Sequence, residues 1–140
     1  MTEHEIAIAR DQIRALLAHY NNNGDRGRIE DLASVFAPDG VLEFSGQRFE
    51  GRAAIEAELS AIATGGRAEI KLAGSRHNLT TSRIDFEAQN RALGWTYFFV
   101  SRQGRIIEEG TYIDAYVRLA EGWRIAHRRV KTLFAAYHEG

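Results

Sequence analysis

Apolar side chains recur at helical spacing in three stretches of the first half of the chain. The first stretch begins after Thr2, where a capping box opens it. We expect it to end at residues 21–24, because Asn and Gly readily close a helix in the left-handed conformation. The second stretch covers about residues 27–36, with Asp25 placed to cap it, and the third covers about residues 52–63. The pattern therefore predicts three helices.

Most of the remaining chain alternates apolar and polar residues with the period of two that strands show. A short strand is expected at residues 41–44, after a Pro-Asp-Gly turn, and a hairpin should follow it. Four long strands are predicted at about residues 71–87, 91–102, 105–119 and 123–134. Short turns separate them, so neighbouring strands should pair antiparallel. Helices followed by strands indicate an α+β fold, in which a twisted sheet is covered by helices on its concave side.

One irregularity interrupts the first long strand. Alternation puts His77 and Leu79 on one face, whereas Ile84 falls on the opposite phase. A bulge between Thr80 and Arg83 would reconcile the two phases. Bulges occur beside active sites and also wherever a sheet has to curve, so this feature leaves both explanations open.

Composition and charge limit the classes of function. The 140 residues fit one domain, residues 1–140, and 44% of them are hydrophobic. The 18 basic side chains are scattered among 19 acidic ones, so we expect no nucleic-acid partner. The absence of cysteine excludes disulfides, thiolate catalysis and cysteine-ligated zinc. The N-terminal residues do not resemble a signal peptide and no apolar run reaches roughly 20 residues, so we expect a cytoplasmic protein without a membrane partner.

The hairpin after Arg102 predicts which aromatic side chains share a face. If its loop has two residues, counting back along both strands pairs Trp95 with Tyr112. One face of the sheet then carries Trp95, Tyr97, Phe99, Glu108, Gly110 and Tyr112. An aromatic face with polar tips suits a pocket for a flat ligand, and it would serve equally as packing beneath helices.

A histidine beside a carboxylate is the simplest construction for moving a proton near neutral pH. His77 lies in the middle of a predicted strand, and His127 could face either an interface or solvent. Surface positions are expected for His4, His19 and His138. Asp25 has an ordinary role as a helix cap, and composition does not link it to His77.

Other charged residues also allow two explanations each. Arg128 could bind an anion, but the inferred pairing places it near Asp114, where a salt bridge explains it equally well. Glu108 and Glu109 lie in tandem on opposite faces, so one of them could enter a pocket. The chain lacks the motifs of phosphate loops, serine hydrolases and His-x-x-x-His metal sites, and we expect neither a metal nor a cofactor.

A series of short motifs resembles the nuclear-transport-factor-two-like superfamily, also called SnoaL-like, over nearly the whole chain. The motifs are Tyr20-Asn21, Gly24-Asp25, residues 32–36, Asp39-Gly40, residues 76–79, Gly110-Thr111-Tyr112 and residues 122–125. The resemblance implies a cystatin-like α+β barrel, a cone-shaped curved antiparallel sheet with about three helices on its concave side. Within the superfamily the chain is similar to the branch that contains scytalone dehydratase and hexachlorocyclohexane dehydrochlorinase.

This branch implies the composition of an active site. Its enzymes pair an aspartate at the end of the first helix with a strand histidine, here Asp25 and His77. The dehydrochlorinase adds an arginine on the last strand, here Arg128. The histidine would take a proton from carbon, which implies a cofactor-free lyase or isomerase acting on a small cyclic or aromatic molecule. The residues expected to bind the substrate are Tyr20, Leu42, Trp95, Tyr97, Phe99, Tyr112 and Val130.

The resemblance also leaves alternatives. Asn21 and Gly24 stand where the dehydrochlorinase has larger apolar residues, which implies a different substrate. Some relatives use the fold only structurally, so a non-catalytic ligand-binding or assembly domain is the alternative function. In either case we expect a homodimer or higher homo-oligomer through the open face of the sheet, covering Trp123 and Ile125.

Overall fold

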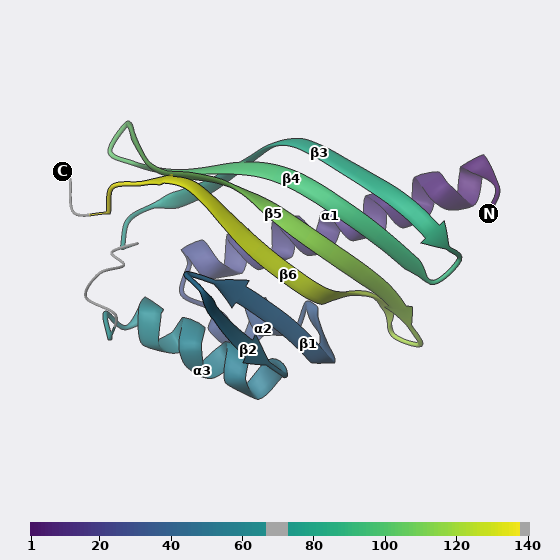
Figure 1. Ribbon diagram of the computed structural model, residues 1–140, viewed down its shortest axis with the longest axis horizontal. Helices are drawn as coiled ribbons and strands as arrows, with labels where there is room; N and C mark the ends of the chain where they lie inside the picture. The colour runs from purple at the N-terminus through teal and green to yellow at the C-terminus, as the bar shows by residue number, and fades with distance from the viewer. Residues whose placement is uncertain (67–72, 138–140) are drawn as a thin grey trace.

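The computed structural model describes residues 1–66 and 73–137, in which helices cover one face of a curved six-stranded sheet (Figure 1). The elements in chain order are α1 (Glu3–Asp25), α2 (Ile29–Ala33), β1 (Phe36–Phe44), β2 (Gln47–Glu50), α3 (Arg52–Ala63), β3 (Arg76–Ala88), β4 (Arg91–Arg102), β5 (Arg105–Leu119) and β6 (Gly122–Ala135). Across the sheet the order is β2-β1-β6-β5-β4-β3. The predicted α+β fold is confirmed. His138 and the start of the strand predicted at 71–87 lie outside the described residues.

The end of α1 differs from the prediction. Thr2 caps the start of the helix as expected, because its hydroxyl accepts a hydrogen bond from the Glu5 N–H at 3.1 Å. At the other end the helix continues to Asp25, and the Asn23 side-chain amide donates to the His19 carbonyl at 2.8 Å. The predicted capping role of Asp25 is therefore wrong, since Asp25 is the last helical residue and α2 starts without a side-chain cap.

The chain changes from helix to strand earlier than predicted. The second helix is only Ile29–Ala33, because Phe36 already pairs with Ile125 in β6. The Ile125 N–H donates to the Val35 carbonyl at 2.8 Å at the same place. β1 runs parallel to β6, so the sheet is mixed, and all its other strand pairs are antiparallel. The predicted Pro-Asp-Gly turn falls within β1, where the register shifts.

A β-bulge changes the register of β4 against β5. Arg102 pairs with Arg105, as the predicted two-residue loop requires. β5 then carries one extra residue, Ile107, so that Val100 pairs with Glu108. A shift of one residue moves side chains to the other face relative to the partner strand.

The bulge overturns the predicted aromatic face. Tyr112 pairs with Thr96 instead of Trp95, and Phe98 pairs with Gly110. Trp95, Tyr97 and Phe99 consequently lie on the face of the sheet away from the helices, where Trp95 is 37% and Tyr97 is 54% exposed. The placement of these three on the same face as Tyr112 is wrong.

The irregularity predicted in the first long strand is confirmed. The register of β3 against β4 shifts between Leu79, which pairs with Phe98, and Ser82, which pairs with Thr96. This shift lies between β3 and β4, and the Ile107 bulge lies in the neighbouring pair of β4 and β5. Both accompany the curvature of the sheet (Figure 1).

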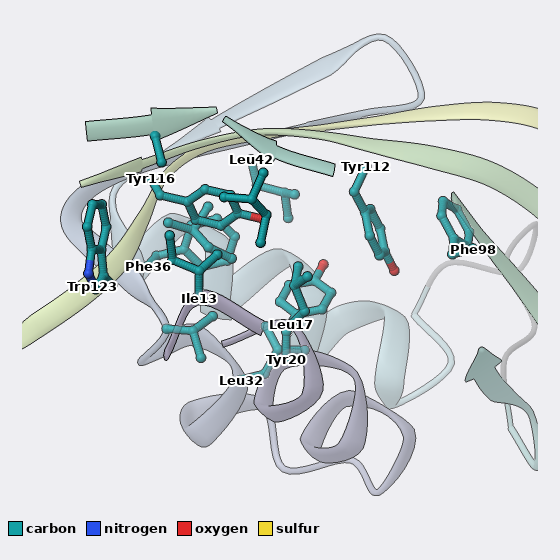
Figure 2. Packing of buried hydrophobic residues seen from close by; sticks show 14 of the residues in the cluster. Ile13, Leu17, Tyr20, Leu32, Phe36, Leu42, Phe98, Tyr112, Tyr116 and Trp123 are labelled. Carbon is teal, nitrogen blue, oxygen red and sulfur yellow. The ribbon is translucent and has the colours of Figure 1, made fainter. Parts of the chain in front are cut away.

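Figure 2 shows apolar side chains of α1, α2 and the sheet packing together in the core. Among the described residues the core also contains a fully buried cation, Arg128. Its Nε and Nη2 donate to the two carboxylate oxygens of Asp114 at 2.8 and 2.9 Å, so the predicted pairing with Asp114 is confirmed. The Arg128 Cζ also lies 4.3 Å from the ring centroid of Tyr20 and 3.9 Å from that of Tyr112. The Tyr116 hydroxyl completes the cluster by donating to Asp114 at 2.8 Å.

The Arg128 guanidinium keeps its positive charge in this cluster. Burial alone would lower the pKa of Arg128, but the charge and hydrogen bonds of Asp114, together with the two tyrosines, outweigh burial and raise the pKa. Burial, followed by the nearby Asp114 charge, raises the pKa of Tyr116 well above its ordinary value. The cluster is therefore a cation, an anion and neutral phenols.

The face expected to form an oligomer differs from the prediction. Trp123 and Ile125 are 3% and 0% exposed, because they point into the core. The large apolar side chains exposed on β4 and β6 are instead Trp95, Tyr97, Leu133 and Phe134. The homo-oligomer stays a prediction, and Trp123 and Ile125 are not available to form its contact.

Removing one partner of the buried ion pair should strongly destabilise the protein, because the other charge then lacks compensation. We expect Asp114→Leu to lower the free energy of unfolding by about 3–5 kcal/mol, measured by urea denaturation. The double variant Asp114→Leu with Arg128→Met should recover much of this loss. A loss in the single variant below about 1 kcal/mol, as for an exposed pair, would contradict the role assigned to the pair.

Candidate active site

A cavity of about 220 Å³ opens between the concave face of the sheet and the C-terminal ends of α1 and α3. Most of its wall is apolar, with Leu32, Leu59 and Ile62 among the helical contributions. A dry cavity of about 150 Å³ is large enough to bind benzene, so this one can hold a substituted single ring. Polar side chains interrupt the wall, and Asn21, Asp25, His77 and Glu108 are among them.

Asp25 and His77 meet on this wall, although they are 52 positions apart in the chain. The Asp25 Oδ1 lies 2.7 Å from the His77 Nδ1, and the Asp25 Oδ2 accepts the His77 backbone N–H at 2.9 Å. Their side chains are 17% and 18% exposed. One carboxylate therefore holds both the backbone and the ring of His77, which fixes the direction of the imidazole.

This contact determines which imidazole nitrogen can react. An ionised carboxylate only accepts hydrogen bonds, so the Nδ1 of His77 carries the hydrogen that faces Asp25. In the neutral ring the lone pair then belongs to Nε2. No described residue forms a hydrogen bond with Nε2, which is thus available to take a proton from a bound molecule.

Aromatic rings support the imidazole from one side. The His77 ring stacks on Phe98 with centroids 6.2 Å apart, and Phe98 stacks on Tyr112 at 4.4 Å with an interplanar angle of 14°. Figure 2 shows Phe98 beside Tyr112 under the sheet. The bulge at Ile107 places Phe98, and not the predicted Phe99, in this stack.

Asn21 and Tyr112 form a polar contact next to the dyad. The Tyr112 hydroxyl donates to the Asn21 Oδ1 at 3.1 Å. The Asn21 Nδ2 is buried and has no acceptor among the described residues. Burial raises the pKa of Tyr20 and raises that of Tyr112 well above its ordinary value, so both remain neutral phenols. A ligand oxygen would supply the acceptor that the Asn21 amide lacks.

Arg128 lies behind the cavity wall and does not line it. The rings of Tyr20 and Tyr112 separate its guanidinium from the cavity. Both carboxylate oxygens of Asp114 accept hydrogen bonds from Arg128. Any effect of this cation on a ligand therefore passes through the two tyrosines.

The structure brings together some of the predicted substrate-binding residues. Tyr20, Tyr112 and Val130 line the cavity. Leu42 is fully buried in the core and does not line it. Trp95, Tyr97 and Phe99 are on the opposite face for the reason given above, so their expected place at the pocket is wrong.

Asn21 and Phe98 are among the wall residues that the sequence analysis did not predict. Asn21 stands four positions before Asp25 on α1, so the two share a helix face, and this spacing was a usable signal. Phe98 carried no such signal, because its face depends on the bulge. His127 pairs with Glu43 on β1 and does not line the cavity.

Within residues 1–66 and 73–137 no group of three or more His, Asp or Glu side chains could hold a metal ion. None of the helices there is long and apolar enough to cross a membrane.

Comparison with known proteins places these features in a family. Residues 5–129 match the SnoaL-like domain. The chain belongs to the SnoaL-like family. No curated protein matches the chain. The SnoaL-like family includes polyketide cyclases, scytalone dehydratase and LinA, a hexachlorocyclohexane dehydrochlorinase.

Three solved structures show how far the similarity extends. A protein of unknown function from Mycobacterium tuberculosis is 28% identical with a TM-score of 0.78, over 92% of this chain and 74% of that one. A candidate scytalone dehydratase from Novosphingobium aromaticivorans is 19% identical with a TM-score of 0.82, over 99% and 93%. LinA is 17% identical with a TM-score of 0.82, over 100% and 96%. The latter two similarities establish a common fold.

The stack on His77 can be tested with two adjacent phenylalanines of this SnoaL-like chain. We expect Phe98→Leu to lower the free energy of unfolding by about 1–3 kcal/mol, because it removes two ring contacts from a buried position. Phe99→Leu, on the other face, should cost about 0.5 kcal/mol. Urea denaturation of both variants measures the difference, and equal losses would count against the observed register.

Proposed function

We propose that this SnoaL-like protein is a cofactor-free lyase or isomerase that takes a proton from carbon of a small cyclic or aromatic molecule. The observation that carries the proposal is the Asp25 carboxylate, which holds the His77 Nδ1 at 2.7 Å on the wall of a cavity. This arrangement leaves the Nε2 lone pair as a base.

The first step is proton abstraction by His77. Its Nε2 takes a proton from a carbon next to an electron-withdrawing group, and the ring becomes an imidazolium. Asp25 stabilises that cation, because the carboxylate already accepts from Nδ1 in the resting state. The backbone contact to the same carboxylate keeps the ring from rotating away.

The second requirement is a partner for the negative charge that develops on the substrate. The Asn21 Nδ2 is a buried donor without an acceptor among the described residues, and Asn21 lines the cavity beside Asp25. A carbonyl or enolate oxygen placed there would receive this hydrogen bond. Tyr112 holds the Asn21 Oδ1, and Arg128, one of the predicted catalytic residues, supports the Tyr112 ring from behind.

The alternative function is a domain that binds or assembles without catalysis. A cone filled by side chains would favour it, whereas the cavity here has room for a ring. Asp25 contacts both the backbone and the ring of His77. A purely structural role requires only that the hydrogen bonds of such a buried pair are formed, and it gives no reason for the pair to face a cavity.

Cyclohexanone in heavy water tests proton abstraction without requiring a leaving group. We expect the wild-type protein to accelerate deuterium incorporation next to the carbonyl over buffer, followed by NMR. His77→Gln should lower the enzymatic rate by roughly 10²–10⁴-fold, because the base is removed while the fold remains. Asp25→Asn should also lower it, because an amide can present its own hydrogens to Nδ1 and so disfavour the reactive tautomer.

His127→Gln is the matched control, since His127 also pairs with a carboxylate, Glu43, but lies outside the cavity. This variant should retain the wild-type rate. If the wild-type protein is no faster than buffer, or if the two histidine variants lose equal activity, the proposed function is wrong.

A further inference from the structure

The cavity contains a second acidic side chain that the Asp25 and His77 pair does not use. Glu108 lines the cavity and is 6% exposed. The Tyr137 hydroxyl donates to its Oε1, and the Thr132 hydroxyl lies 3.4 Å from its Oε2. Thr132 and Tyr137 also line the cavity. Burying a carboxyl group costs free energy, so its position on the wall of a cavity indicates a role in binding or catalysis there.

Glu108 faces His77 across one strand. His77 pairs with Val100, and Val100 pairs with Glu108, so the three residues form one row across β3, β4 and β5. Paired residues share a face of the sheet, and strands are about 4.8 Å apart, which sets the His77 and Glu108 backbones roughly 10 Å apart. The bulge at Ile107 creates this row, because without it Val100 would pair with Ile107.

We propose that Glu108 is a second catalytic group, which binds a hydroxyl of the substrate and gives that oxygen a proton as it leaves. This inference rests on the proposed function, because it assigns His77 the proton on carbon. It specifies the substrate class as a single ring that carries a hydroxyl one carbon away from the acidic C–H, as in a cyclic β-hydroxy ketone.

The proposed reaction is the elimination of water. His77 Nε2 takes the proton from carbon, and the electron pair of the broken C–H bond forms the new C=C bond. The C–O bond breaks, the leaving oxygen keeps the electron pair of the C–O bond, and this oxygen receives the proton of the Glu108 carboxyl. Water and an unsaturated ketone result, and the proton on His77 returns to Glu108 through solvent. No other reactant is needed.

A hydroxyl fits this position better than a halogen. Hydroxide is a poor leaving group that has to be protonated, and a carboxyl group placed beside it meets that need. A leaving halide departs as an anion without a proton, so it does not need an acid beside it. Glu108 therefore favours oxygen as the leaving atom.

Tyr137 acts as a positioning residue for Glu108. Burial, and then its hydrogen bond to Glu108, raises the pKa of Tyr137, so the phenol stays neutral and continues to donate to Oε1. The Oε2, with the distant Thr132 hydroxyl, is left as the oxygen that can exchange a proton with a ligand.

Two probes that differ only in their leaving group test the acid role. We expect the wild-type protein to convert 3-hydroxycyclohexanone to cyclohexenone, followed by ultraviolet absorbance. Glu108→Gln should slow this reaction by roughly 10²–10⁴-fold and slow elimination of acetate from 3-acetoxycyclohexanone by less than about tenfold, because acetate leaves without a proton. His77→Gln should slow both reactions. The matched control is Glu109→Gln, which changes the exposed neighbour on the other face and should slow neither.

The outcomes separate the two proposals. If Glu108→Gln slows both probes equally, or neither, the acid role is wrong. If the wild-type protein exchanges deuterium into cyclohexanone but does not release water from 3-hydroxycyclohexanone, the acid role is wrong and the proposed function stands.

Ligand affinity tests the assignment of Glu108 to a hydroxyl even if the protein catalyses neither reaction. We expect the wild-type protein to bind cyclohexanol about 10-fold or more tightly than chlorocyclohexane by NMR titration, because the Glu108 carboxyl can form a hydrogen bond with a hydroxyl and gains little from chlorine. The preference should disappear in Glu108→Leu, which has no hydrogen-bonding group, and persist in His77→Gln. Equal affinity of the wild-type protein for the two probes would overturn the assignment of Glu108 to a hydroxyl.

Discussion

A cation in a protein core is costly unless an anion pairs with it, and the partners of Arg128 organise this structure. Asp114 neutralises the guanidinium from the neighbouring strand, while the rings of Tyr20 from α1 and Tyr112 from β5 both lie against it. The helix and the sheet are thereby fixed against each other at the point where the cavity begins. The two tyrosines that satisfy the buried charge are also the back wall of the cavity, so stability and ligand binding depend on the same contacts.

Much of the fold was predictable because long, regular stretches carry a clear period. The strands Arg91–Arg102 and Arg105–Leu119 begin and end where the alternation and turns predict, and the helix Arg52–Ala63 does too. The faces were less predictable. One extra residue at Ile107 moves Trp95 and Tyr97 to the outer surface and brings Phe98 inside, whereas only the bulge in β3 was predicted from the alternation.

The candidate site was also predictable only in part. Asp25 and His77 could be connected only through resemblance to a family, because each residue alone has an ordinary explanation in a helix end or a strand. Their contact depends on α1 continuing to Asp25 instead of stopping at the preceding glycine, and local sequence favours the earlier stop. The position of Arg128 near Asp114 could be predicted only approximately from the turn between β5 and β6, because the register shifts between Ala115 and Tyr116, between that turn and the pair.

The contact between Asp25 and the backbone of His77 has a consequence beyond chemistry. β3 is the last strand on its side of the sheet, and such a strand offers unpaired N–H groups to any other extended chain. At His77 that N–H is already occupied by the Asp25 carboxylate, which α1 delivers across the end of the cone. The Asp25 carboxylate thus removes one N–H group from those that this edge strand could offer to a second chain, at the same residue whose imidazole it holds.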